Sequence, residues 1–97
     1  MKFILIFAFF AAAQAIPWIP ECRDDPWWKR EHEIIIQNAI RLGPNITTVF
    51  YGDSITEGWG GAGREVFDRE YAPLGTANHA IGGDRTEHLL CRIPDEV

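Results

Sequence analysis

The sequence lacks a second long hydrophobic run, internal repeats and low-complexity tracts. Its one sustained apolar stretch, at positions 3–13, is too short to form a stable membrane anchor. Basic residues form no stripe, because the 9 lysines and arginines are scattered among 14 acidic residues and the net charge is −5. A nucleic-acid groove needs clustered positive charge. We therefore expect no nucleic-acid partner and no stable membrane anchor.

Cysteine is also scarce. Cys22 and Cys91 are the only two, and no CxxC motif or nearby histidine spacing accompanies them. Metal sites need such clustered ligands, so we predict no metal site, and nothing in the sequence implies an organic cofactor. In an oxidising compartment the two cysteines can pair with each other. Pairing with other cysteines, or one buried thiol, fits equally well, because sequence does not fix the distance between their Cα atoms.

Residues 1–15 have the pattern of a secretory signal peptide: Lys2, an apolar run, and the small-x-small site Ala13-Gln14-Ala15. We predict cleavage after Ala15 and a secreted product, with an uncleaved membrane anchor as the alternative. Asn45-Ile46-Thr47 is an N-glycosylation sequon, which marks a surface position in a secreted chain. Asn45 is therefore the predicted glycosylation site.

The rest of the chain alternates helical and strand patterns. Three prolines predict an extended arm over 16–26, and an apolar stripe of period 3.6 predicts a helix over 27–42, capped by Asp24 or Asp25. We predict strands over 46–51 and 76–81, a glycine-rich loop over 58–63 and a short helix over 64–71. A third helix is predicted after Asp84, which would cap it with Glu87 reaching back. This order predicts the start of a flavodoxin-like, three-layer, doubly wound α/β domain with only its first two strands and three helices.

The strongest functional motif is Gly52-Asp53-Ser54-Ile55-Thr56 at the end of the first predicted strand. It places a serine hydroxyl at the carboxyl end of a buried strand, beside a helix start whose N–H groups and dipole suit a developing oxyanion. Ser54 is the candidate nucleophile, and its own N–H is a candidate oxyanion donor. Gly83, in a glycine loop predicted at the same sheet edge, is the second candidate donor.

Residues near Ser54 and Gly83 are expected to support the site structurally. Gly52 is a supporting residue of this motif, and we expect Asp53 to make structural hydrogen bonds rather than to act as an acid or base. Asp84 is interpreted as a helix cap and Glu57 as an acidic residue that favours the helix start. Trp59 is a candidate wall of an acyl pocket or a packing residue. The three histidines are interpreted as packing or surface residues.

Two of these motifs resemble a known family. Gly52–Thr56 resembles the first block of the SGNH, or GDSL-type, hydrolases, and Asn78-His79-Ala80-Ile81-Gly82-Gly83-Asp84 is similar to their second block. The pattern is most similar to catalytic subunits of the platelet-activating factor acetylhydrolase type, which also have a tryptophan-containing helix before the first strand. The resemblance covers about residues 24–93. It implies a serine esterase without cofactors, with Ser54 as nucleophile and Gly83 as an oxyanion donor.

The same resemblance implies parts that this sequence does not contain. The family's third oxyanion donor, an asparagine, and its Asp-x-x-His pair lie in later blocks. We therefore interpret residues 27–97 as the amino-terminal portion of a truncated SGNH domain and expect it to be inactive by itself. The expected substrates are small acyl esters, acetyl esters among them, of lipids or carbohydrates. The alternative is a short, non-catalytic secreted protein. Oligomeric state is not predicted.

Overall fold

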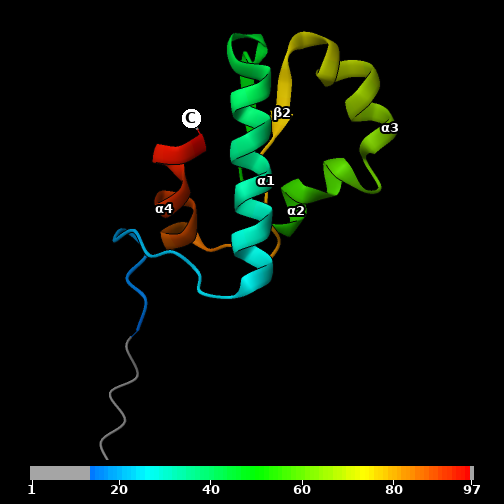
Figure 1. The fold of residues 1–97 in the computed structure, drawn as a ribbon. Coiled ribbons are helices and arrows are strands. Elements are labelled where there is room, and N and C mark those ends of the chain that lie inside the picture. Colours follow the sequence, from blue (N-terminus) through cyan, green and yellow to red (C-terminus); the bar gives the residue numbers. More distant parts are fainter. Residues whose placement is uncertain (1–13, 97) are drawn as a thin grey trace, which may run out of the picture.

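The computed structural model describes residues 14–96, so most of the predicted signal peptide, residues 1–13, lies outside the described part of the chain. The described residues form a small α/β structure with four α-helices and two parallel strands (Figure 1). The elements, in chain order, are α1 (Pro26–Leu42), β1 (Thr48–Phe50), α2 (Ser54–Glu57), α3 (Arg64–Val66), β2 (Thr76–Asn78) and α4 (Thr86–Glu96). Short 3₁₀ turns and one π-helical turn, Phe67–Tyr71, complete the connections.

Helix α1 begins where the sequence predicts. The Asp25 carboxylate accepts a hydrogen bond from the Trp28 N–H at 2.8 Å, and Pro26 occupies the first turn. This bond lowers the pKa of Asp25, because the ionised carboxylate is the better acceptor. Trp28 and Ile35 form the hydrophobic core together with Ile81. The apolar stripe predicted over residues 27–42 is only partly buried, because Trp28 and Ile35 are covered whereas Ile40 is exposed.

Both strands are shorter than predicted. The parallel ladder joins Thr48–Phe50 to Thr76–Asn78, whereas the sequence predicts strands over 46–51 and 76–81. Strand β2 ends at Asn78 because its side-chain oxygen accepts a hydrogen bond from the Ala80 N–H at 3.2 Å. Such local bonds compete with the ladder.

The two chain segments nevertheless stay adjacent beyond the regular strands. The His79 N–H donates to the Phe50 carbonyl at 2.8 Å, and the Ile81 N–H donates to the Gly52 carbonyl at 3.1 Å. The residues that follow β1 and β2 are therefore held together at one end of the sheet.

Side chains of β1 point alternately to two different environments. Val49 lines a groove with Ala39 of α1 and Asp95 of α4, whereas the Phe50 ring contacts the Trp59 and Tyr71 rings with centroids 5.9 and 5.2 Å away. Successive residues of a strand face opposite sides of a sheet. The sheet therefore has α1 and α4 on one face and the aromatic segment around α3 on the other. Val66, on α3, is exposed.

The arm before α1, predicted to be extended, has no helix or strand but contains a turn closed by the Ile19 N–H to Ile16 carbonyl bond, and it is tied to α4. Cys22 and Cys91 form a disulfide, with their Cα atoms 5.3 Å apart, and the Glu21 N–H donates to the Glu87 carbonyl at 3.0 Å. In Figure 1 the arm passes below α4 before it reaches the start of α1. A disulfide of this kind is typical of proteins that fold in an oxidising compartment.

Candidate active site

The segment after β1 forms a tight turn that exposes Ser54. Gly52 is buried, and a Cβ there would meet the Thr56 hydroxyl oxygen at 2.5 Å, so only glycine fits. Asp53 caps α2, because its carboxylate accepts from the Ile55 N–H at 3.0 Å. Ser54 is exposed at the first position of α2.

The helix that follows Ser54 is much shorter than a dipole argument requires. Helix α2 has only 4 residues and passes directly into a 3₁₀ turn. The macrodipole grows from aligned peptide units, so one turn contributes little. Any stabilisation of an oxyanion here therefore has to come from individual N–H groups.

The glycine loop lies against this turn. The Gly82 N–H donates to the Glu57 carboxylate at 2.8 Å, and a Cβ on Gly82 would lie 3.1 Å from the same carboxylate. Gly83 has φ +83°, a conformation that side chains rarely adopt. Among the described residues, no protein acceptor is found for the N–H of Ser54 or of Gly83. The structure thus brings the two predicted donors to one end of the sheet and leaves both N–H groups free of protein partners there.

A shallow cavity of about 580 Å³ adjoins Ser54. Its wall combines Ser54, Glu57 and Asn78 with the exposed side chains of Trp27 and Ile34 from α1. The Trp59 ring packs against Tyr71, 5.3 Å between centroids, and is not part of that wall. The residues beside the serine can therefore contact a small ligand that has both apolar and hydrogen-bonding groups.

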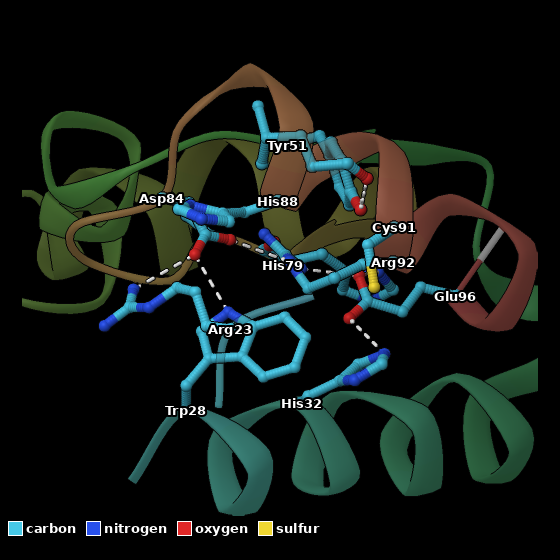
Figure 2. Close-up of polar contacts among 12 residues, drawn as sticks. Arg23, Trp28, His32, Tyr51, His79, Asp84, His88, Cys91, Arg92 and Glu96 are labelled. Atoms are coloured by element: carbon cyan, nitrogen blue, oxygen red, sulfur yellow. Dashed lines mark hydrogen bonds and ion pairs between the residues drawn. The ribbon is translucent and has the colours of Figure 1, made fainter. Parts of the chain in front are cut away.

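Asp84 does not cap α4, contrary to the sequence-based prediction. The helix starts at Thr86, and the Asp84 carboxylate is buried, where it accepts from Trp28 Nε1 at 2.8 Å, Arg92 Nε at 2.9 Å and Arg23 Nη1 at 3.1 Å. Figure 2 shows these donors converging on Asp84 from the arm, α1 and α4. A buried carboxylate needs several donors to offset its lost hydration, and long-range contacts supply them here.

A second buried group surrounds Arg92. This side chain is 0% exposed and donates to the His79 carbonyl at 2.9 Å and to the Glu96 carboxylate at 2.6 Å. His32 Nε2 lies 3.4 Å from the other Glu96 oxygen. Burial raises the pKa of Glu96 to about 7 and lowers the pKa of His32 and of His79, because each charged form loses hydration.

None of the three histidines contacts Ser54 in the part of the chain that the structure describes. His32 and His79 belong to the buried group around Arg92, and His88 Nδ1 accepts from the Arg85 N–H at 2.9 Å. This agrees with their interpretation as packing residues. A catalytic base for Ser54 is therefore not among these side chains in the observed arrangement.

Sequence reasoning missed two residues of this site. Glu57 was interpreted only as an acidic residue at a helix start, yet it accepts from the Gly82 N–H. Arg23 donates to the Gly82 carbonyl at 2.8 Å from the arm, 59 residues away in sequence. No periodicity or motif in the sequence predicts this contact of Arg23. The adjacent Cys22 is the one residue whose type indicates that the arm can be bonded to another segment.

Asn45 is exposed in the 3₁₀ turn that precedes β1, whereas Ser54 follows β1, so a glycan would project from the opposite end of the strand. Among residues 14–96, no group of three potential ligands is placed to hold a metal ion. No described helix has the length and apolarity that a membrane span requires. Comparison of the chain with models of known protein families finds no match, and comparison with curated proteins finds no similar sequence.

Proposed function

We propose that this chain carries the nucleophile-bearing part of a secreted SGNH-type serine esterase. The observation that supports the proposal most directly is the junction of the Ser54 turn with the glycine loop, made by the Gly82 N–H to Glu57 bond at 2.8 Å. At this junction an exposed hydroxyl and the N–H groups of Ser54 and Gly83, for which no acceptor is found within residues 14–96, lie at one end of a parallel sheet. A doubly wound, flavodoxin-like domain is the wider fold that we propose around these two strands.

The proposed reaction proceeds through an acyl-enzyme. The Ser54 oxygen attacks the ester carbonyl carbon as a base removes the hydroxyl proton, and the carbonyl oxygen becomes an oxyanion near the N–H groups of Ser54 and Gly83. The C–O bond to the alcohol then breaks, and the alcohol leaves with a proton. Water hydrolyses the acyl-serine by the same route. The reaction requires a base that none of the three described histidines supplies.

The proposed substrates are small esters of lipids or carbohydrates, acetyl esters among them. The Ser54 cavity supports this class, because Trp27 and Ile34 offer apolar contact while Asn78 and Glu57 offer polar groups. No cofactor enters the proposed chemistry. Secretion is part of the proposal, supported by the Cys22–Cys91 disulfide and the signal-peptide pattern of residues 1–15.

The test uses protein secreted from cells that express the complete open reading frame. Hydrolysis of p-nitrophenyl acetate is measured for the wild type, Ser54→Ala and the matched control Thr48→Ala, an exposed hydroxyl at the other end of β1. We expect turnover to be abolished only by Ser54→Ala, with an unchanged circular dichroism spectrum. A fluorophosphonate probe should label Ser54 in the wild type. Equal turnover of wild type and Ser54→Ala would refute the nucleophile assignment.

All three histidines contact partners other than Ser54. This observation supports one rival proposal, in which the protein is a non-catalytic secreted module. The two proposals differ in the same assay. The module would give no turnover above Ser54→Ala and no phosphonate labelling, while it would fold as a monomer with a cooperative urea transition.

A further inference from the structure

We infer that Arg23, anchored by the Cys22–Cys91 disulfide, is a positioning residue that orients the Gly83 N–H toward the site. This inference rests on the proposed function of Ser54 and adds a part of the chain that lies outside both sequence motifs. The inference assigns a role to the arm before α1. The esterase proposal gives this arm no role.

The contact that carries the inference is a hydrogen bond to a single peptide unit. Arg23 Nη1 donates to the Gly82 carbonyl oxygen at 2.8 Å. That carbonyl and the Gly83 N–H belong to the same planar, trans peptide group, so they point in opposite directions. When Arg23 holds the carbonyl on the arm side, the Gly83 N–H must point away from the arm.

A second contact fixes the preceding peptide unit from the other side. The Gly82 N–H donates to Glu57, which belongs to the same turn of helix as Ser54. Gly82 is therefore held through its N–H by the serine segment and through its carbonyl by the arm. The Asp84 N–H also donates to the Ile81 carbonyl at 3.2 Å and closes a turn around Gly82 and Gly83. Because glycine itself restricts the backbone very little, the two bonds to Gly82 add the contacts that select the orientation of the central peptide unit within this turn.

Arg23 is in turn well fixed. Its Nε donates to Asp25 at 3.0 Å, its Nη1 also reaches Asp84 at 3.1 Å, and its side chain is 20% exposed. The planar guanidinium suits this geometry, because its N–H groups lie in a rigid fork. A Cβ on Gly83 would lie 3.2 Å from Nη1, so the guanidinium packs closely over the loop.

The disulfide connects this contact to redox state. Cys22 precedes Arg23 directly and bonds to Cys91 on α4, while the Glu21 N–H bonds to the Glu87 carbonyl at 3.0 Å. Among the described hydrogen bonds, those of Asp24 and Asp25 join the end of the arm to the first turn of α1, so without the disulfide the Glu21 N–H alone would tie the arm to α4 and Arg23 would tie it to the glycine loop. We therefore expect reduction to release Arg23 and to loosen the loop.

The test compares Arg23→Ala, the double variant Cys22→Ser/Cys91→Ser and the control Lys29→Ala in the secreted protein. Lys29 is a nearby cation whose bond to Asp24 at 3.0 Å lies on the surface. Asp84 keeps Trp28 and Arg92 as partners in Arg23→Ala, so the core should survive. Amide hydrogen exchange of Gly82, followed by ¹⁵N NMR, reports the loop directly and needs no catalysis.

We expect Gly82 exchange to be at least about tenfold faster in Arg23→Ala and in the double cysteine variant, and unchanged in Lys29→Ala. Turnover number should fall by about 10²-fold in both test variants while KM stays within about twofold, since orientation is lost and binding is not. Unchanged Gly82 exchange in Arg23→Ala would overturn the inference, whatever the activity. Faster exchange with a normal turnover number would also overturn it. If Ser54→Ala retains full turnover, the esterase proposal fails, and the exchange rates alone decide whether Arg23 holds the loop.

Discussion

At the scale of single residues, the site depends on glycines at positions that no other residue can occupy. Gly52 is pressed against Thr56, and Gly83 has a positive φ with the Arg23 guanidinium directly over it. These constraints come from backbone conformation and close approach. They explain why small changes in the loop should affect orientation of an N–H group more than overall stability.

The first residue-scale prediction concerns Gly83→Ala. A Cβ at φ +83° is strained and lies 3.2 Å from Arg23, so the peptide should rotate and displace the Gly83 N–H. We expect turnover of p-nitrophenyl acetate to fall by about 10²-fold, the usual effect of losing one oxyanion donor. Gly43→Ala is the matched control, because Gly43 also has a positive φ, +47°, a Cβ there meets no described atom within 4 Å, and the residue lies in the 3₁₀ turn before β1. Equal effects of the two substitutions would contradict the assignment of Gly83.

The second residue-scale prediction concerns Asn45. The secreted protein should shift in mobility after PNGase F treatment, and Asn45→Gln should abolish the shift, because the sequon is exposed. Esterase turnover should be unchanged in Asn45→Gln, since Asn45 precedes β1 and Ser54 follows it. Secreted material from eukaryotic cells that shows no shift would leave Asn45 as an ordinary turn residue.

At the scale of elements, α4 is attached to the rest of the fold mainly by polar contacts. Arg92 and Glu96 are buried on this helix and face His79 after β2 and His32 on α1, while Asp95 lies 3.6 Å from His32. Buried ionisable groups make the docking of a helix dependent on pH, because each group changes its proton occupancy on folding.

We predict that Glu96→Gln changes the pH dependence of stability. The pKa of Glu96 is about 7 in the fold, above its ordinary value of 4.5, so folding takes up a proton between these values. Its contribution to stability is complete below pH 4.5 and is lost as pH rises through 7. The lowered pKa values of His32 and His79 act in the opposite direction, contributing fully above pH 6.5 and losing their contribution as pH falls through the folded pKa.

Urea unfolding at pH 5 and pH 7.5 measures this effect in the secreted protein. Between these two pH values the wild type should lose about 1–3 kcal/mol of unfolding free energy relative to Glu96→Gln. The matched control is Glu65→Gln, an exposed carboxylate on α3. Parallel pH profiles for the wild type and Glu96→Gln would show that Glu96 does not titrate in this range.

At the scale of the whole molecule, the apolar core is thin and much apolar surface stays exposed. The core cluster contains Trp28, Ile35 and Ile81, whereas Ile40 and Ile55 are 69% and 86% exposed. Within the described residues each strand pairs with one neighbour only, and a groove of about 530 Å³ runs past residues 46–49. Unpaired strand edges and exposed apolar groups favour association with other chains.

We therefore predict that residues 16–97, expressed alone, do not form a stable monomer and hydrolyse esters no faster than their Ser54→Ala variant. The disulfide stabilises the arm but covers neither strand edge. Size-exclusion chromatography should show self-association, and circular dichroism with urea should show no cooperative transition. A monomer with a sharp transition would favour the non-catalytic module over the esterase.

Features that depend on neighbouring residues can be predicted from the sequence. Asp25 caps α1 and Asp53 caps α2 because a side chain bonds an N–H two or three positions away. Helix α1 and the order of the strands follow from local periodicity, and Gly52 and Ser54 from one short motif. Long-range packing fixes the Cys22–Cys91 pairing and the roles of Arg23 and Asp84. Those depend on residues 56 to 69 positions apart, whose separation in space is set by packing of the whole chain and not by any local pattern.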